Sequence, residues 1–188
     1  TGEWLWHVGE PNRVPVPTPV VHQGVLYASR GYSSGPYMAV KTGGRGDVAK
    51  THVLWEVKTG APYVSSLLYY QGLIYMATET GIVTCVDASN GELLWRERFG
   101  GVFSASPVAA DGKVYLVNEA GEAFVLEAGR EKKLLQRNEL QLVKTKDGLL
   151  PKLDLFITLG KTGYAHSFGG SLRDFDVPNY DAAAGVTY

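Results

Sequence analysis

Several features that would narrow the class of this 188-residue sequence are scarce or missing. Cys85 is the only cysteine, so no disulfide can form within the chain. No run of about 18 apolar residues is present, which excludes a membrane-spanning helix of ordinary length. The formal net charge is −1, so no basic field exists to attract nucleic acid. The chain opens on Thr1 with no signal-like segment, and we therefore expect a processed or partial protein.

What the sequence does contain is a mixture of residues typical of short strands. There are 23 glycines, 11 tyrosines and four tryptophans. Glycine suits tight turns, and aromatic residues are enriched in strands. Hydrophobic residues make up 45% of the chain and charged residues 20%, which is ordinary for a globular protein and excludes wholesale disorder. The composition therefore favours many short strands joined by turns.

A short pattern recurs three times along the chain. Trp6, Trp55 and Trp95 each follow a leucine, and they lie 49 and 40 residues apart. Gly-x-x-Tyr elements recur with spacings of 48 and 40, and a small residue followed by an apolar step precedes each of them at the same spacings. Independent landmarks that keep one register indicate a true internal repeat. The Gly-x-x-Tyr elements end at Tyr27, Tyr75 and Tyr115.

Each repeat is long enough for four short strands. In the best-formed copy the pattern predicts strands over 93–99, 104–110, 113–118 and 122–129, with a hairpin turn at Asp111-Gly112. Four antiparallel strands in a repeat of about 40 residues are the unit of a β-propeller blade. A blade needs neighbours to bury both of its faces, so one tryptophan per repeat is expected to pack between adjacent blades.

Residues 91–129 resemble the repeat of the PQQ-like, or quinoprotein-type, β-propeller family. The repeat of that family runs as G-x-x-x-W, S-x-P, D-G-x-V-Y and a later glycine. The resemblance covers 1–137 and implies an all-β fold, a partial PQQ-like β-propeller built from four-stranded antiparallel blades, with the general strand plan of WD40-like repeats. The matching positions are Gly91, Trp95, Ser106, Pro107, Asp111, Gly112, Val114, Tyr115 and Gly121.

The repeat pattern stops after Arg137. A fourth copy should place Ser-x-Pro near residue 146, where the sequence instead reads KDGLLPK. We therefore predict about three propeller blades over 1–137 and an atypical, edge-capping tail over 138–188, with one plausible strand at 153–160. Three blades do not close a ring, and open blade edges invite pairing with another chain. The chain is therefore expected to self-associate.

The resemblance also implies chemistry that this sequence does not carry over. Dehydrogenases of the family hold PQQ over a tryptophan with a bound Ca²⁺ and a catalytic aspartate, and many have a pair of adjacent cysteines. This chain has one cysteine and scatters its acidic residues singly through the repeats, so we expect no PQQ. In the tail, Asp174, Asp176 and Asp181 are an alternative set of Ca²⁺ ligands, although their spacing lacks the glycine and final glutamate of an EF-hand.

The tail also contains a motif similar to the nucleophile elbow of lipases. Residues 165–169 read AHSFG, which matches A-x-S-x-G, and in that family a histidine activates the serine. The family order places the histidine after the serine, and none follows Ser167 here. A glycine- and serine-rich loop is the simpler interpretation. Catalysis by Ser167 with His166 stays as the alternative.

These observations predict a non-catalytic β-propeller module that acts as a binding or scaffolding surface in the bacterial envelope. We expect it to be periplasmic or secreted, to bind protein rather than nucleic acid, and to need no cofactor. One alternative is a hydrolase of esterase or lactonase type that uses Ser167 or a metal. The other is a PQQ-dependent quinoprotein oxidoreductase, which ranks behind the hydrolase.

Overall fold

A computed structural model describes residues 2–10, 14, 16–31, 35–139, 156–160 and 181–185. These residues contain strands and turns and no helix. None of their elements is therefore a helix long and apolar enough to cross a membrane. The chain divides into two units, Thr1–Gln141 and Leu142–Tyr188. The first unit carries the repeats.

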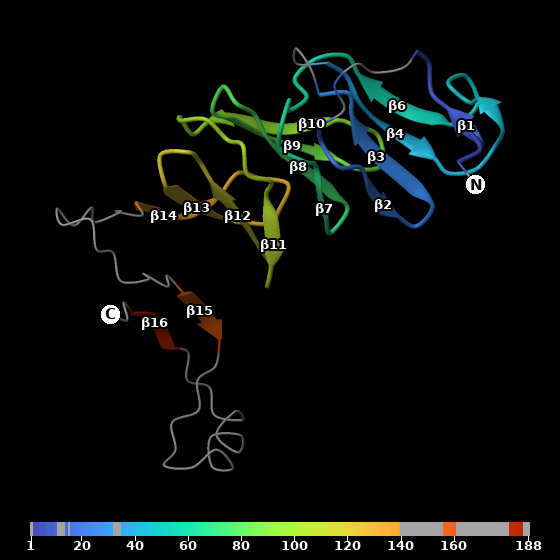
Figure 1. Ribbon diagram of the computed structural model, residues 1–188. Helices are drawn as coiled ribbons and strands as arrows, with labels where there is room; N and C mark the ends of the chain where they lie inside the picture. The colour runs from blue at the N-terminus through green and yellow to red at the C-terminus, as the bar shows by residue number, and fades with distance from the viewer. Residues whose placement is uncertain are drawn as a thin grey trace, which may run out of the picture. The chain divides into compact units, whose positions relative to one another are not determined.

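The first unit contains three four-stranded antiparallel sheets, which we call blades 1, 2 and 3 (Figure 1). In each blade the strands lie in chain order, which confirms the partial propeller. Blade 1 consists of β2 (Val20–His22), β3 (Val25–Ser29), β4 (Tyr37–Lys41) and β6 (Val53–Val57). Blade 2 consists of β7 (Leu68–Tyr70), β8 (Leu73–Ala77), β9 (Ile82–Asp87) and β10 (Leu93–Arg98). Blade 3 consists of β11 (Val108–Ala110), β12 (Lys113–Val117), β13 (Glu122–Glu127) and β14 (Leu134–Glu139).

The strand that carries the tryptophan is the last strand of a blade and not the first. The four strands predicted from one sequence repeat begin with 93–99, but β10 pairs with β9 and so belongs to blade 2. Trp95 on β10 and Trp55 on β6 occupy the same place on the outermost strand of their blades. The equivalent place in blade 3 holds Gln136. Each sequence repeat therefore supplies strands to two consecutive blades, and the third blade lacks the tryptophan.

Tight turns with positive φ connect the first and second strands of each blade. Asp111 and Gly112 have φ values of 55° and 71°, which is the pattern of a type I′ hairpin turn. Gln71 and Gly72 repeat it with 51° and 79°. Because the Cβ of any other residue is strained at such angles, glycine is favoured, and it stands at the second position of each turn. The hairpin turn predicted at Asp111-Gly112 is confirmed.

The core lies between the blades, and blade 2 is buried on both faces. Residues Leu73–Ala77 of β8 are all 5% exposed or less. Since successive side chains of a strand point to opposite faces, Tyr75 packs with Leu116 and Phe124 of blade 3, while Ile74 packs with the side chains of blade 1. One strand thus contributes to two interfaces.

Two smaller pairings complete the described strands. In the first unit, β1 (Trp6–His7) pairs in parallel with β5 (Gly46–Asp47), which lies in the longer connection between β4 and β6. In the second unit, β15 (Phe156–Gly160) pairs antiparallel with β16 (Asp181–Gly185). The strand predicted in the tail is confirmed by β15.

Candidate binding surfaces

Blade 2 contacts blade 3 through a tyrosine and a tryptophan that hydrogen-bond one turn. The Tyr75 hydroxyl accepts a hydrogen bond from the Gly129 N–H at 2.8 Å. The Trp95 Nε1–H donates to the Gly129 carbonyl at 3.4 Å. Burial raises the pKa of Tyr75, so this hydroxyl stays protonated. Tyr75 and Trp95 therefore position the next blade. Between blades 1 and 2, the rings of His22, Tyr69 and Tyr27 stack on one another and line a pocket of about 300 Å³.

The same junction contains an ion pair and the single thiol. Hydrogen bonds from Ser89 and Arg130 lower the pKa of Asp87 to about 2, and Arg130 belongs to the turn of blade 3. Burial raises the pKa of the Cys85 thiol to about 12. A thiol that is protonated at neutral pH is a poor nucleophile, so Cys85 is a packing residue.

Blade 1 contacts blade 2 in a similar way. The Trp55 Nε1–H donates to the Ala88 carbonyl at 3.0 Å. A Cβ added at Gly91 would come within 2.6 Å of the Trp55 ring, so only glycine fits beneath the indole. A second link comes from the small residue that precedes each blade, because the Thr18 N–H donates to Ser66 Oγ at 2.9 Å. The same bond recurs between blades 2 and 3, where the Ser66 N–H donates to Ser106 Oγ at 2.9 Å. The residues that carry the repeat are the residues that join the blades.

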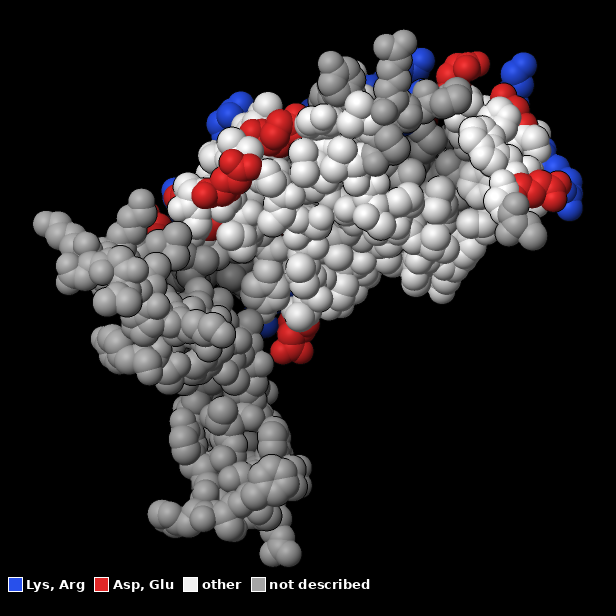
Figure 2. All heavy atoms as spheres, in the orientation of Figure 1, with Lys and Arg blue, Asp and Glu red and all other residues white. Residues whose placement is uncertain are grey.

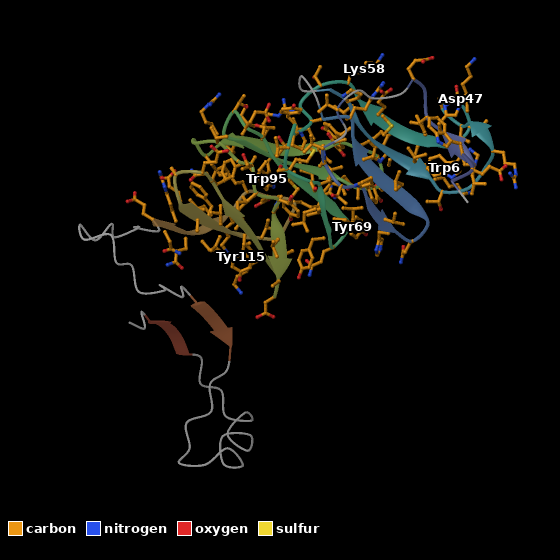
Figure 3. The ribbon with its side chains drawn as sticks, viewed as in Figure 1. Trp6, Asp47, Lys58, Tyr69, Trp95 and Tyr115 are labelled. Carbon is orange, nitrogen blue, oxygen red and sulfur yellow. The ribbon has the colours of Figure 1, made fainter. Side chains whose placement is uncertain are left out.

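Blade 3 presents the equivalent of this joining surface without a following blade among the described residues. The centre of its outward face holds Val108, Tyr115, Val117, Ala123 and Val125, which lie opposite one another in the strand register and so share one side of the sheet. Four polar residues share this side: Lys113, Glu127, Gln136 and Asn138. Val108 is 61% exposed and Val117 39% exposed, whereas Tyr115 is half-buried (Figure 3). The outward face is therefore an apolar centre flanked by polar side chains, and no further blade of the described residues covers it.

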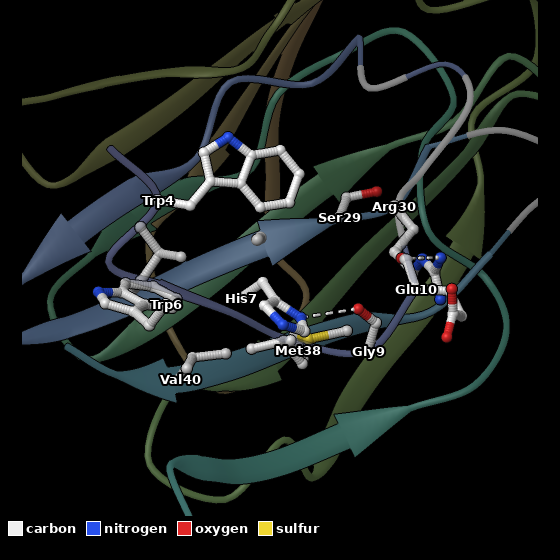
Figure 4. Close-up of a pocket in the computed structure, with 12 residues that line it drawn as sticks. Trp4, Trp6, His7, Gly9, Glu10, Ser29, Arg30, Met38 and Val40 are labelled. Atoms are coloured by element: carbon white, nitrogen blue, oxygen red, sulfur yellow. Dashed lines mark hydrogen bonds between the residues drawn. The ribbon is translucent and has the colours of Figure 1, made fainter. Parts of the chain in front are cut away.

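A second candidate surface is a pocket of about 380 Å³ between the N-terminal segment and blade 1 (Figure 4). Trp6 packs against the cluster that contains Met38 and Val40, while Trp4 at the margin is 77% exposed. The walls are mostly apolar, but His7 and Ser29 also line them, and at one end the Arg30 guanidinium donates to the Glu10 carbonyl at 2.9 Å. Such a pocket suits an apolar side chain.

Charged side chains show no single-sign patch on the face drawn in Figure 2. Lysine and arginine are interspersed there with aspartate and glutamate along the margins, and a broad uncharged area lies between them. A nucleic-acid surface is typically a clustered basic patch. The visible face therefore does not have the clustered basic patch of a nucleic-acid surface.

The site residues predicted from the tail are not brought together by the described part of the chain. His166, Ser167, Asp174 and Asp176 lie outside the described residues, and Asp181 is placed only as the first residue of β16. Within the described ranges, no group of three or more His, Cys, Asp or Glu side chains could hold a metal ion. The nucleophile elbow and the Ca²⁺ ligand set stay predictions.

One polar site was missed by sequence reasoning. Arg96 lines a small pocket on blade 2 that also contains several threonines. The aligned repeats contained a signal for this site, because a glutamate of blade 3, Glu122 on β13, is replaced in blade 2 by Ile82 on β9. Only a position-by-position comparison of the two blades could have found it.

The described blades define this chain as a section of a PQQ-like β-propeller. A model of the family described as outer membrane protein assembly factor BamB matches residues 44–139, just over half of the chain. The chain therefore belongs to this family. A comparison with curated protein sequences finds no match.

Solved structures of larger propellers share the fold. BamB from Moraxella catarrhalis is 14% identical with a TM-score of 0.53, and the match covers 67% of this chain and 36% of that one. Quinohemoprotein alcohol dehydrogenase ADHIIG from Pseudomonas putida HK5 is 18% identical with a TM-score of 0.57, covering 72% and 22%. The enzyme of the same name from Comamonas testosteroni is 20% identical with a TM-score of 0.53, also covering 72% and 22%. The chain thus spans about a third of that BamB and about a fifth of the dehydrogenases, and these likenesses show the fold alone.

Proposed function

We propose that this chain is a non-catalytic β-propeller module that provides a binding or scaffolding surface in the bacterial envelope, in the periplasm or as a secreted protein. The description of its family, an outer membrane protein assembly factor, supports an envelope role. The outward face of blade 3 carries the proposal, because no further blade of the described residues covers its apolar centre, whereas blades 1 and 2 bury the equivalent face. Contiguous exposed apolar surface typically marks a site of protein interaction.

The comparison of three equivalent tyrosines supports the need for a partner. Tyr27 of blade 1 and Tyr75 of blade 2 are 5% and 0% exposed, whereas Tyr115 of blade 3 is half-buried. Val108, beside Tyr115, is 61% exposed. Full burial of a valine contributes about 1.5–3 kcal/mol relative to full exposure, so covering this face is favourable.

The occupant we propose for this face is a second copy of the chain. A two-fold dimer uses the same patch on both copies, and the outward face of blade 3 meets its equivalent without needing any further surface. The edge strands β11 and β14 add unpaired backbone groups at the margins of the contact. Self-association would make the module a scaffold with its other surfaces still available.

Light scattering at micromolar concentration tests this proposal. The unmodified chain should have twice the 20.4 kDa mass of a monomer. Tyr115→Lys places a charge in the contact and should give the monomer mass. Leu93→Lys is the control for an added surface charge, since Leu93 is an apolar residue, 51% exposed, on the outermost strand of blade 2. A monomer for the unmodified chain, or a dimer that persists in Tyr115→Lys, contradicts the proposed contact.

The absence of catalysis is tested separately. Short-chain p-nitrophenyl esters and acyl lactones are offered with and without Ca²⁺, and no turnover is expected. Turnover that Ser167→Ala abolishes would replace the scaffold with the hydrolase, and turnover that only a chelator removes would indicate a metal site. Substrate oxidation after addition of PQQ, Ca²⁺ and an electron acceptor would support the quinoprotein alternative.

A further inference from the structure

Blades 2 and 3 carry an arginine at the same position of the outermost strand. Arg96 lies opposite Thr84 in the pairing of β10 with β9, and Arg137 lies opposite Phe124 in the pairing of β14 with β13. Directly opposed residues share one face of a sheet. In both blades this is the face turned toward the preceding blade, because Phe124 packs against blade 2 and Val86, which shares the face of Thr84, packs against blade 1.

In blade 3 the arginine is fully partnered. Arg137 forms an ion pair with Glu122, and its guanidinium carbon lies 5.5 Å from the centre of the Phe124 ring. The hydrogen bond from Arg137 is the main reason that the pKa of Glu122 lies below its ordinary value. This blade therefore supplies both the anion and the flat surface that a guanidinium favours.

In blade 2 both partners are replaced. Ile82 stands in the place of Glu122, and Thr84 stands in the place of Phe124. The Arg96 Nε–H donates to Thr84 Oγ1 at 3.4 Å, and no acid of the described residues forms an ion pair with Arg96. The neighbouring Glu97 alternates to the opposite face, where it pairs with Lys132 of blade 3.

The loss of the phenylalanine also leaves space. A pocket of about 240 Å³ lies beside Arg96, and the hydroxyl-bearing side chains of four threonines line it. The Arg96 guanidinium lies close to the segment that leaves blade 1, since a Cβ added at Gly60 would come within 2.7 Å of Nη2. Arg98, on the same face, donates to the Thr80 carbonyl at 2.9 Å. The threonines are Thr59, Thr78, Thr80 and Thr84.

We propose that this pocket binds a carboxylate, which pairs with Arg96 as Glu122 pairs with Arg137. The two oxygens of a carboxylate match the paired N–H groups of a guanidinium. The hydroxyls of Thr59 and Thr84 can donate further hydrogen bonds to it, whereas the Thr78 hydroxyl already donates to the Ile82 carbonyl at 3.2 Å. The small volume suits an acidic side chain of a peptide. This site goes beyond the scaffolding role and does not rest on it, because its residues belong to blades 1 and 2 and not to the outward face of blade 3.

Amide NMR spectra of the full chain test the site. The ligands are N-acetyl-glutamate methylamide, its glutamine counterpart, sodium acetate and inorganic phosphate, each at constant ionic strength. We expect saturable shifts of the Gly60 and Thr84 amides with the glutamate compound and none with the glutamine compound. Acetate that binds as tightly would identify free small acids as the ligand of the same carboxylate site.

Two variants at one position provide the decisive control. Ile82→Glu copies blade 3 and should fill the site from within, so that binding weakens at least tenfold and the melting temperature rises. Ile82→Gln has nearly the same shape without the charge and should still bind, whereas Arg96→Gln should not. Equal shifts with the glutamine compound, binding of phosphate alone, or binding that survives in both Ile82→Glu and Arg96→Gln would overturn the proposal.

Discussion

Blade 2 and blade 3 are built from copies of the same sequence repeat, yet their strands differ in how deeply they are buried. Every residue of β8 in blade 2 is 5% exposed or less. In β12 of blade 3 only alternate residues are buried, with Leu116 at 1% and the adjacent Val117 at 39%. A repeat sequence thus specifies the shape of a blade, whereas the neighbour on either side decides which of its residues form a core. The following predictions use this difference.

The largest difference is expected at the tryptophan position. Trp95→Ala should lower the free energy of unfolding by about 3–5 kcal/mol, as for other large aromatic side chains in a core. Gln136→Ala, at the equivalent exposed position of blade 3, should change it by less than about 0.5 kcal/mol. Urea denaturation measures both. Equal costs would mean that blade 3 is buried as blade 2 is.

A smaller difference is expected for the tyrosine hydroxyl. Tyr75→Phe leaves the Gly129 N–H without its acceptor, and an unsatisfied buried group costs about 1–3 kcal/mol. Tyr115→Phe should be close to neutral, because the Tyr115 hydroxyl has no hydrogen bond within the described residues. The same denaturation measurement compares the two. A substantial cost at Tyr115 would indicate an unrecognised partner for its hydroxyl.

The serines that precede blades 2 and 3 should contribute less. Ser106→Ala removes the acceptor of the Ser66 N–H, and Ser66→Ala removes the acceptor of the Thr18 N–H at 2.9 Å. Each bond is exposed, so each substitution should cost about 0.5–1 kcal/mol. Similar costs in unfolding free energy for the two substitutions would support an equal role of the serines at both blade junctions. No cost for either would show that the prolines and apolar packing position these segments without the serine hydroxyls.

The smallest effect concerns pH. The pKa of Asp87 is about 2 in the folded chain, against an ordinary value of 3.8, so its carboxylate stabilises the folded state above pH 3.8. This contribution is lost as the pH falls from 3.8 toward 2. The difference in unfolding free energy between the unmodified chain and Asp87→Asn should therefore be constant at neutral pH and shrink across that range. A difference that stays constant down to pH 2 would contradict the role of Asp87 at the blade junction.

The sequence was sufficient for features that depend on local spacing. The turns at positive φ and the number of blades follow from recurring glycines and tryptophans, which every copy of the repeat contains. The sequence could not show that β10 belongs to blade 2, because the repeat is equally compatible with pairing to the strand before it or the strand after it. The sequence could also not show the pocket at Arg96, since the pocket needs side chains from two blades. His166 and Ser167 lie outside the described residues and stay predictions.

Hydrogen exchange of the backbone amides, measured at nanomolar and at high micromolar concentration, tests the central claim most directly. If the outward face of blade 3 is an open joining surface that a second copy covers, β12 should exchange faster than β8 in dilute solution and slow at high concentration. The amides of β8 should not change. Protection of β12 equal to that of β8 at both concentrations would contradict this account, because the face would then already be covered within a single chain.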